Sequence, residues 1–282
     1  MTNFRQTVKK IFPPVVWKPI SDTRYAINRA AQWPAATFHP WRRFSIARLM
    51  AMKDIHRGER CFIIGNGPSL RKTDVSKLKG EFTFGMNRIY LAFDKWGFET
   101  SYLVSVNDLV IEQCVDDFLA LDMPCFFSWR SRRFFPRETL ENVNVPTFLH
   151  TTYTGPKFSQ DVSGRVWEGA TVTNVCLQLA FHMGFEQVIL IGVDHSFAAK
   201  GKPNMTVVSS GDDQSHFDPR YFGKGFRWQL PDLDTSEQGY WLAKQAYDAA
   251  GRSVVDATIG GHLQVFPKIA YETLFQSTGK SE

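Results

Sequence analysis

The stretch ATVTNVCLQLAFHMGFEQVILIGVD, residues 170–194, joins a helix-like segment directly to a strand-like one. Thr171 or Thr173 can cap the start of the helix, and Gly184 can end it. The run VILIGV is apolar enough for a strand buried on both faces, as in a parallel sheet. The stretch therefore predicts a helix followed by a central parallel strand. The apolar side chains on one face of that helix are Val172, Val175, Cys176, Leu179, Ala180 and Met183.

The same alternation continues on both sides of this unit. A second helix is expected at about residues 236–250, and further strand-like runs lie before and after. Their order favours an α/β fold with a mainly parallel sheet. With no internal repeat in the sequence, we expect a basic segment over residues 1–60 and one domain over residues 61–282. The further runs are CFIIG (61–65), FTFGMN (82–87), SYLVSVND (101–108), PCFFSW (124–129), VPTFLH (145–150) and SVVDAT (253–258).

The net charge of +5 is concentrated at one end of the chain. Residues 1–60 hold twelve Lys and Arg against three Asp and Glu, so the rest of the 282 residues are acidic overall. Residues 1–20 and 41–53 mix aromatic and aliphatic side chains with these cations, which suits an anionic membrane surface. Alternatively, the segment packs on its own domain or on a second subunit of a homo-oligomer. No nucleic acid partner is expected, because the chain has no recognition module.

The composition favours a globular protein of the cytoplasm, associated with the inner face of the membrane if the basic segment binds lipid. With 43% hydrophobic residues the chain can bury a core, but no apolar run approaches the roughly 20 residues of a membrane span. The N-terminus lacks the pattern of a secretory signal. The cysteines form no CxxC pair or zinc-type cluster, so free buried thiols are expected at Cys61, Cys114, Cys125 and Cys176.

The segment CFIIGNGPSL, residues 61–70, places a glycine-rich turn directly after a strand-like run. Such a turn can aim backbone N–H groups at an anion, with Asn66 and Ser69 adding side-chain hydrogen bonds. It lacks the lysine of a Walker A loop, and Leu70 stands where the dinucleotide fingerprint needs a small residue. Two hypotheses follow, a nucleotide phosphate site formed by Gly65, Asn66, Gly67, Pro68 and Ser69, and a purely structural turn.

Polar side chains follow three other strand-like runs. Asn87, Asn107 and Asp194 each come where a run ends, and parallel strands place such ends at one edge of a sheet. They could meet around one polar ligand, although Asn is also a common turn residue. Asp108 could hold a metal or a sugar hydroxyl, or cap a helix that begins near Leu109.

Residues 199–234 are polar and long for a connection, which favours an ordered lid. His216 lies in this segment, and His195 directly follows Asp194. Both are placed to reach a ligand, and imidazole titrates near ambient pH, as a general base requires. An exposed loop histidine is the alternative for each.

Several of these motifs together resemble the MptE-like family, named after an archaeal 6-hydroxymethylpterin pyrophosphokinase. They also resemble the related bacterial sialyltransferases and Maf-type flagellin nonulosonate transferases. The resemblance covers roughly residues 60–270 and implies a Rossmann-like domain with helices on both faces of the sheet and a lid. Its motifs are IIGNGPSL, GMNRIY, SVND, the 170–197 segment and VVDATIGGHLQVFPK.

The sialyltransferase branch implies a donor site for a sialic acid activated by cytidine monophosphate (CMP). By this resemblance Asn66 would lie near the donor phosphate, and Asn87 and Asn107 near the sugar and ribose. A small polar segment of the family matches Thr171 and Val172. Gly192 and Asp194 would lie against the nucleoside.

Two positions depart from that branch. Ser196 and Phe197 stand where the branch has two tyrosines that stabilise the leaving phosphate, so Arg220 or Tyr221 of the lid would have to replace them. The motif Ser215-His216-Phe217 matches the segment that precedes the branch's catalytic histidine, but Arg220 stands where that histidine is expected. His216 is therefore the hypothetical base.

The leading hypothesis is a metal-independent glycosyltransferase. It would move a nonulosonic acid from a CMP-activated donor to a hydroxyl of a glycan or glycolipid acceptor, without a cofactor. The first alternative is a diphosphotransferase that uses ATP and Mg²⁺ and needs Asp108 and Asp194 at the phosphates. The second is a non-catalytic nucleotide-binding protein at the membrane.

Overall fold

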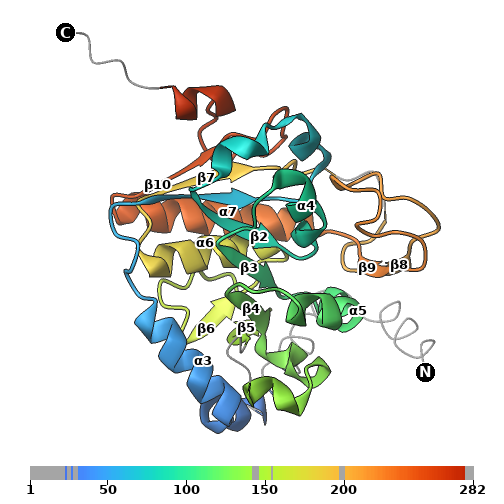
Figure 1. The fold of residues 1–282 in the computed structure, drawn as a ribbon. Helices are drawn as coiled ribbons and strands as arrows, with labels where there is room; N and C mark the ends of the chain where they lie inside the picture. The colour runs from blue at the N-terminus through green and yellow to red at the C-terminus, as the bar shows by residue number, and fades with distance from the viewer. Residues whose placement is uncertain are drawn as a thin grey trace.

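The structure is a computed structural model that describes residues 23, 27, 31–141, 146–153, 155–196 and 201–276. Residues 1–20 of the expected basic segment, Phe197, and the first two residues of the expected lid, 199–200, lie outside the described residues. Helix and strand labels are those of Figure 1.

An eight-stranded sheet forms the centre of the fold, and every neighbouring pair in it is parallel. The strand order is β10-β7-β1-β2-β3-β4-β5-β6. The chain runs outward from β1 to β6 and then returns to β7 on the other side of β1, so the order reverses between β1 and β7. The bounds are β1 Arg60–Ile64, β2 Phe82–Met86, β3 Tyr102–Ser105, β4 Cys125–Ser128, β5 Thr147–Thr152, β6 Arg165–Trp167, β7 Gln187–Ile191 and β10 Ser253–Asp256.

Helices cover both faces of this sheet (Figure 1). On one face α6 and α7 pack against alternate strand residues such as Ile63, and on the other face α4 and α5 pack against Phe62 and its equivalents. The expected α/β class with helices on both faces is confirmed. The helices are α3 Pro40–Ala51, α4 Phe93–Trp96, α5 Asp108–Leu119, α6 Val172–Met183 and α7 Leu233–Ala249. The 3₁₀ turns are η1 Pro68–Lys72, η2 Val75–Leu78, η3 Ile89–Ala92, η4 Trp129–Phe134, η5 Arg137–Glu141 and η6 Tyr271–Phe275.

Local signals place the ends of α6 where the sequence predicts them. The Thr171 side chain accepts a hydrogen bond from the Thr173 N–H at 3.3 Å, and Gly184 ends the helix with a left-handed φ of 95°. Helix α7 begins three residues before the expected Ser236, because the Asp232 side chain caps it through the Thr235 N–H. The four cysteines are free and buried, as predicted.

The described part of the basic segment packs on the domain from α3 onward. Trp41, Arg42, Ser45 and Leu49 of α3 are buried. The Ser45 hydroxyl accepts a hydrogen bond from the Phe148 N–H of β5 at 2.9 Å, and the indole of Trp41 stacks on the Phe148 ring at 5.7 Å. No helix within the described residues combines the length and the apolar character that a membrane crossing requires.

The lid contains a small antiparallel pair, β8 Thr206–Val208 and β9 Arg227–Gln229, and projects from one side of the molecule (Figure 1). Phe222 stacks on Phe226 and Trp228, with ring centroids 5.0 and 5.2 Å apart. These aromatic side chains join the core cluster on the Phe62 face of the sheet, so the described part of the lid packs on the domain.

Candidate functional site

A pocket of about 210 Å³ opens at the carboxyl edge of the sheet. Its walls come from the loops after β1, β2, β3 and β7, the first turn of α6, the start of α7 and the lid. Strands β1 and β7 flank the point where the strand order reverses. Open parallel sheets bind their ligands at this position, since the loops on either side diverge there.

The glycines after β1 allow two strand-end loops to touch. The Gly65 N–H donates to the Ile191 carbonyl at 2.7 Å, and the Gly67 N–H donates to the Gly192 carbonyl at 2.9 Å. A Cβ atom on Gly65 would lie 2.2 Å from the Gly192 oxygen. The N–H groups that the sequence suggested for an anion therefore join the loops after β1 and β7.

Asp194 completes this junction. Its carboxylate accepts hydrogen bonds from the Ser69 N–H at 3.1 Å and the Ser69 hydroxyl at 2.6 Å. Asn66, between the two glycines, lines the pocket, and its buried Oδ1 has no hydrogen-bond partner among the described residues. An unpaired buried amide oxygen is unfavourable, so Asn66 is the group of this loop that is best placed to receive a ligand donor.

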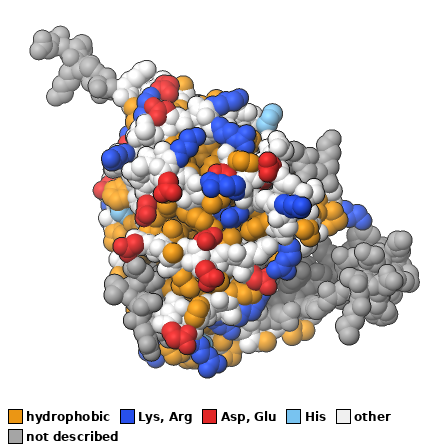
Figure 2. All heavy atoms as spheres, turned by 45° about the vertical axis from the view of Figure 1, so that its right-hand side comes forward, with side chains coloured by type: hydrophobic (Ala, Val, Ile, Leu, Met, Phe, Trp, Pro, Cys, Tyr) orange, Lys and Arg blue, Asp and Glu red, His pale blue; other side chains and the backbone are white. Residues whose placement is uncertain are grey.

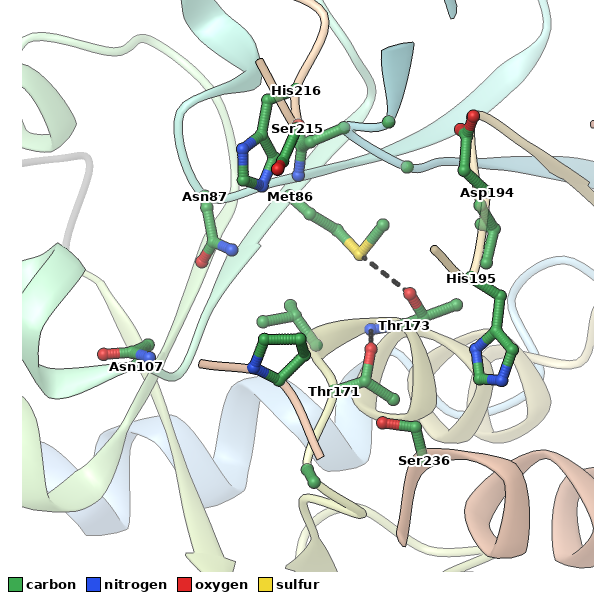
Figure 3. A pocket seen from close by; sticks show the side chains of 18 of the residues that line it. Met86, Asn87, Asn107, Thr171, Thr173, Asp194, His195, Ser215, His216 and Ser236 are labelled. Carbon is green, nitrogen blue, oxygen red and sulfur yellow. Dashed lines mark hydrogen bonds between the residues drawn. The ribbon is translucent and has the colours of Figure 1, made fainter. Parts of the chain in front are cut away.

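Asn87 and Asn107 line the opposite side of the pocket from Asp194 (Figure 3). Asn87 has a left-handed φ of 49°, and its Oδ1 accepts a hydrogen bond from Ser105 at 2.9 Å. The Oδ1 of Asn107 accepts from the Leu109 N–H at 2.9 Å and so caps α5. Asn107 thus takes the capping role that the sequence analysis considered for Asp108.

The N-terminus of α6 faces the pocket through Thr171, Val172 and Thr173 (Figure 3). The first turn of a helix presents backbone N–H groups and the positive end of the helix dipole. The first turn of α6 carries no acidic residue. The positive end of the α6 dipole therefore lies at the pocket wall, while the Thr173 N–H of this turn is already used by the Thr171 cap.

His216 of the lid forms a pair with Asp213. The distance from the His216 Nδ1 to the Asp213 Oδ2 is 2.7 Å, and both residues are less than a tenth exposed. Burial alone would raise the pKa of Asp213, but hydrogen bonds from His216 and from two backbone N–H groups lower it below its ordinary value. An ionised carboxylate that holds Nδ1–H leaves Nε2 as the basic nitrogen of a neutral imidazole.

The two other lid residues of the predicted catalytic set differ in position. Tyr221 lines the pocket, stacks on the His216 ring at 4.1 Å and has a raised pKa because it is buried. Arg220 does not line it, because its exposed guanidinium is paired with Asp218 at 2.8 Å. Figure 2 shows the molecule turned toward the lid side, where hydrophobic side chains lie among both basic and acidic ones. The Arg220 guanidinium therefore lies outside the pocket in this structure.

His195 lines the pocket on the side of Asp194, away from His216 (Figure 3). Its Nε2 lies 3.8 Å from the Glu237 carboxylate of α7. Burial lowers the pKa of His195, and nearby Glu237 only partly offsets this effect. Its backbone is left-handed, with φ 54°. The pocket therefore has an imidazole on each side.

Asp108 lies outside the pocket lining, in an ion cluster. Arg130 and Arg133 contact its carboxylate at 3.0 and 2.8 Å. Among the described residues no group of three or more His, Cys, Asp and Glu side chains could hold a metal ion. The pair Asp108 and Asp194, which the Mg²⁺-dependent alternative requires, is not brought together around this pocket.

The lid is tied to the body of the domain near the pocket. Arg71 of η1 donates to the carbonyls of His216 and Phe217 at 2.7 and 2.9 Å, and the Phe217 N–H donates to the Asn66 carbonyl at 2.9 Å. Arg88 donates to the Arg220 carbonyl at 2.8 Å. These bonds hold the residues around His216 against the loop after β1.

Most of the predicted site residues meet in this pocket. Pro68 and Ser69 lie behind it in η1, and Arg220 and Asp108 lie outside it. The sequence analysis did not select Asp213 as the partner of His216, although an acidic residue three positions before a histidine can reach its ring. The predicted residues that line the pocket are Gly65, Asn66, Gly67, Asn87, Asn107, Thr171, Val172, Gly192, Asp194, His195, His216 and Tyr221. Other lining residues that the sequence analysis did not select include Met86, Thr173, Trp228, Ser236 and Tyr240.

Comparison with known proteins gives a matching family and a similar solved structure. Residues 44–200 match the family model described as "6-hydroxymethylpterin diphosphokinase MptE-like". Among solved structures, a Maf glycosyltransferase from Magnetospirillum magneticum AMB-1 is similar over 94% of this chain and 43% of that chain, with 13% identity and a TM-score of 0.45. This chain thus spans less than half of that structure. No curated protein sequence matches.

Proposed function

This chain belongs to the MptE-like family, and we propose that it is a transferase whose nucleotide-activated substrate binds in the pocket at β1 and β7. The family description itself names a group-transfer reaction. The finer proposal is a glycosyltransferase that uses a CMP-activated nonulosonic acid and a glycan or glycolipid hydroxyl. The observation that carries this proposal is the His216–Asp213 pair, whose histidine lines a pocket at the point where the strand order reverses.

The pocket offers mainly uncharged groups to a donor. Asn66, Asn87 and the first turn of α6 lie around it, which suits a nucleoside monophosphate and a polar sugar. Three of the five described non-glycine residues with positive φ line the pocket, namely Asn87, Ala170 and His195. Such backbone conformations gather at functional sites, where the surrounding structure maintains them.

The proposed reaction uses His216 as general base. Its Nε2 takes the proton of the acceptor hydroxyl, while Asp213 orients the ring and stabilises the imidazolium that forms. The acceptor oxygen attacks the anomeric carbon, and the bond from that carbon to the phosphate oxygen breaks. The electron pair leaves with CMP, whose phosphate would lie at the N-terminus of α6. The lid over the pocket limits hydrolysis of the donor by water.

The experiment separates binding from turnover. His216→Ala should reduce transfer by about 100- to 10,000-fold, the usual contribution of a general base. CMP at 100 times its Kd should still stabilise the variant by about 2.7 kcal/mol, as it stabilises the wild type. His262→Ala, which replaces an exposed histidine outside the pocket, is the matched control. Loss of CMP stabilisation together with turnover would assign His216 a structural role instead.

The family description also supports a second candidate, an ATP-dependent diphosphotransferase. That chemistry would need the carboxylates of Asp108 and Asp194 at the phosphates. Asp108 instead pairs with Arg130 and Arg133 outside the pocket, which weighs against this candidate. Thermal stabilisation by CMP or CTP without metal supports the glycosyltransferase, whereas stabilisation by ATP only with Mg²⁺ supports the diphosphotransferase. Tight nucleotide binding without transfer or hydrolysis would favour a non-catalytic nucleotide-binding protein at the membrane.

The proposed cellular setting is the cytoplasmic face of the membrane, where a lipid-linked acceptor would be accessible. The basic composition of residues 1–60 supports this placement. Partition of the full chain onto vesicles that contain anionic lipid, but not onto neutral vesicles, is the expected result.

A further inference from the structure

A second pocket lies between the start of α3 and the turns η4 and η5, and shares no residue with the first one. We call it the arginine pocket. It uses none of the groups assigned to the transfer reaction, so a ligand bound there occupies a separate site. Its lining residues are His39, Trp41, Arg132, Arg133, Phe135, Pro136 and Arg137.

The polar side chains of the arginine pocket are hydrogen-bond donors. His39 caps α3 by accepting the Trp41 N–H at its Nδ1, at 3.2 Å, so a neutral ring carries its proton on Nε2. The indole N–H of Trp41 is buried and has no partner among the described residues, and the same holds for Trp129. Trp129 packs beneath His39 and Arg132, with its ring 5.1 Å from the His39 ring and 4.2 Å from the Arg132 guanidinium. The one side-chain acceptor, the His39 Nδ1, is used by the helix cap, and the Arg132 guanidinium donates to the Trp129 carbonyl at 3.0 Å; the remaining polar groups of these side chains are donors.

The cations of the arginine pocket are only partly compensated. Arg133 pairs with Asp108 at 2.8 Å, but no carboxylate of residues 31–139, 146–153, 155–196 and 201–276, whose side chains the structure describes, lies within ion-pair distance of Arg132 or Arg137. Burial and the adjacent Arg133 lower the pKa of Arg132, and burial and Arg132 lower the pKa of His39. The positive charges therefore destabilise one another.

We infer that the arginine pocket binds a phosphate group, held by the guanidinium groups of Arg132 and Arg137 and by the ring N–H of His39. Guanidinium groups match phosphate oxygens in geometry and charge. The phosphate could belong to a lipid headgroup or to a soluble phosphate ester. The adjoining surface favours lipid, because Phe38 is 66% and Trp33 is 57% exposed, and their rings contact each other at 5.9 Å. Exposed aromatic side chains beside arginines suit the headgroup layer of a bilayer.

The test compares full-length variants on vesicles of phosphatidylglycerol and phosphatidylcholine. The Arg132→Gln, Arg137→Gln double variant should lose about 30-fold in partition coefficient, since each surface arginine contributes about fivefold. Lys79→Gln with Lys95→Gln removes the same charge from exposed positions outside the arginine pocket and should have a much smaller effect. Arg137→Gln alone, at an exposed side chain, should lose about fivefold and covers the case in which the double variant unfolds.

Inorganic pyrophosphate, titrated against the same variants and followed by thermal stability, tests the soluble source. Phe38→Ser should weaken vesicle binding and leave the pyrophosphate response unchanged. Loss of vesicle binding in the arginine variants assigns a lipid phosphate, and loss of the pyrophosphate response alone assigns a soluble phosphate ester. Equal behaviour of wild type, arginine variants and lysine control in both assays would overturn the inference.

Discussion

Replacing Gly67 by alanine tests the junction between the loops after β1 and β7. The backbone of Gly67 is extended, with φ −70° and ψ 162°, so alanine is allowed there conformationally. The added Cβ, however, would lie 1.9 Å from the Asp194 Oδ2 and 2.9 Å from the Gly192 oxygen. Asp194 must therefore move away, although it has favourable contacts where it stands.

The magnitude follows from the bonds that Asp194 would lose. Its carboxylate accepts the Ser69 N–H at 3.1 Å and the Ser69 hydroxyl at 2.6 Å. Hydrogen bonds to charged groups contribute about 1.5–3 kcal/mol each. Because Asp194 is partly exposed, we take the lower value for each bond. Gly67→Ala should therefore reduce the free energy of unfolding by about 3 kcal/mol.

Denaturant unfolding of a double-mutant cycle measures this effect. Asp194→Ala alone should cost about 3 kcal/mol, and Gly67→Ala added to it should cost less than it does in the wild type, because only the contact with the Gly192 oxygen at 2.9 Å remains. Gly211→Ala, where no atom lies within 4 Å of the added Cβ, should change stability by less than about 0.5 kcal/mol. Additive losses of about 6 kcal/mol, or a neutral Gly67→Ala, would refute the clash as the cause.

Two further variants test the lid and the ion cluster. Arg71→Ala removes both hydrogen bonds to the His216 and Phe217 carbonyls, which hold the lid against the domain. Trypsin should therefore cleave the variant within residues 201–234 about tenfold faster than it cleaves the control Arg57→Ala, which changes an exposed arginine outside the lid. Equal cleavage rates would contradict this role of Arg71. Burial by itself raises the pKa of Asp108. The neighbouring arginines and the hydrogen bond from Ser131 have the larger, opposite effect, so the pKa of Asp108 lies below its ordinary value. Ionised Asp108 therefore adds stability above about pH 4, and this is lost as the pH falls through the lowered pKa. The Tm difference between wild type and Asp108→Asn should shrink below pH 4, and a difference that stays constant from pH 6 to pH 3 would rule this out.

The sequence predicted features that depend on neighbouring residues. The cap at Thr171 and the end of α6 at Gly184 follow from side-chain and backbone preferences within one helical turn. The seven predicted strands are present for a similar reason, because apolar runs of that length are buried as strands. Strand β6 and the pair β8 and β9 were not predicted, since three residues each carry too little pattern.

The sequence correctly predicted the pocket residues that directly follow strands. Asn66, Asn87 and Asp194 meet because all parallel strands end at one edge of the sheet. The sequence did not predict that Asp108 and Arg220 lie outside the pocket. In the structure each side chain forms an ion pair, Asp108 with Arg130 and Arg220 with Asp218, and the sequence pattern does not show which charged groups will pair. Arg130 comes from another segment of the chain than Asp108.

The α/β class, the boundaries of α6 and the positions of the strand-end residues were thus determined by the sequence itself, because short-range preferences suffice for them. The placement of β7 beside β1 was decided only in the tertiary structure, since parallel crossovers leave no local trace of strand order. With that placement came the role of Gly67, whose missing Cβ makes room for Asp194. A contact between residues more than a hundred positions apart exists only after folding, so the sequence could indicate the site's residue types but not the side chains they would contact.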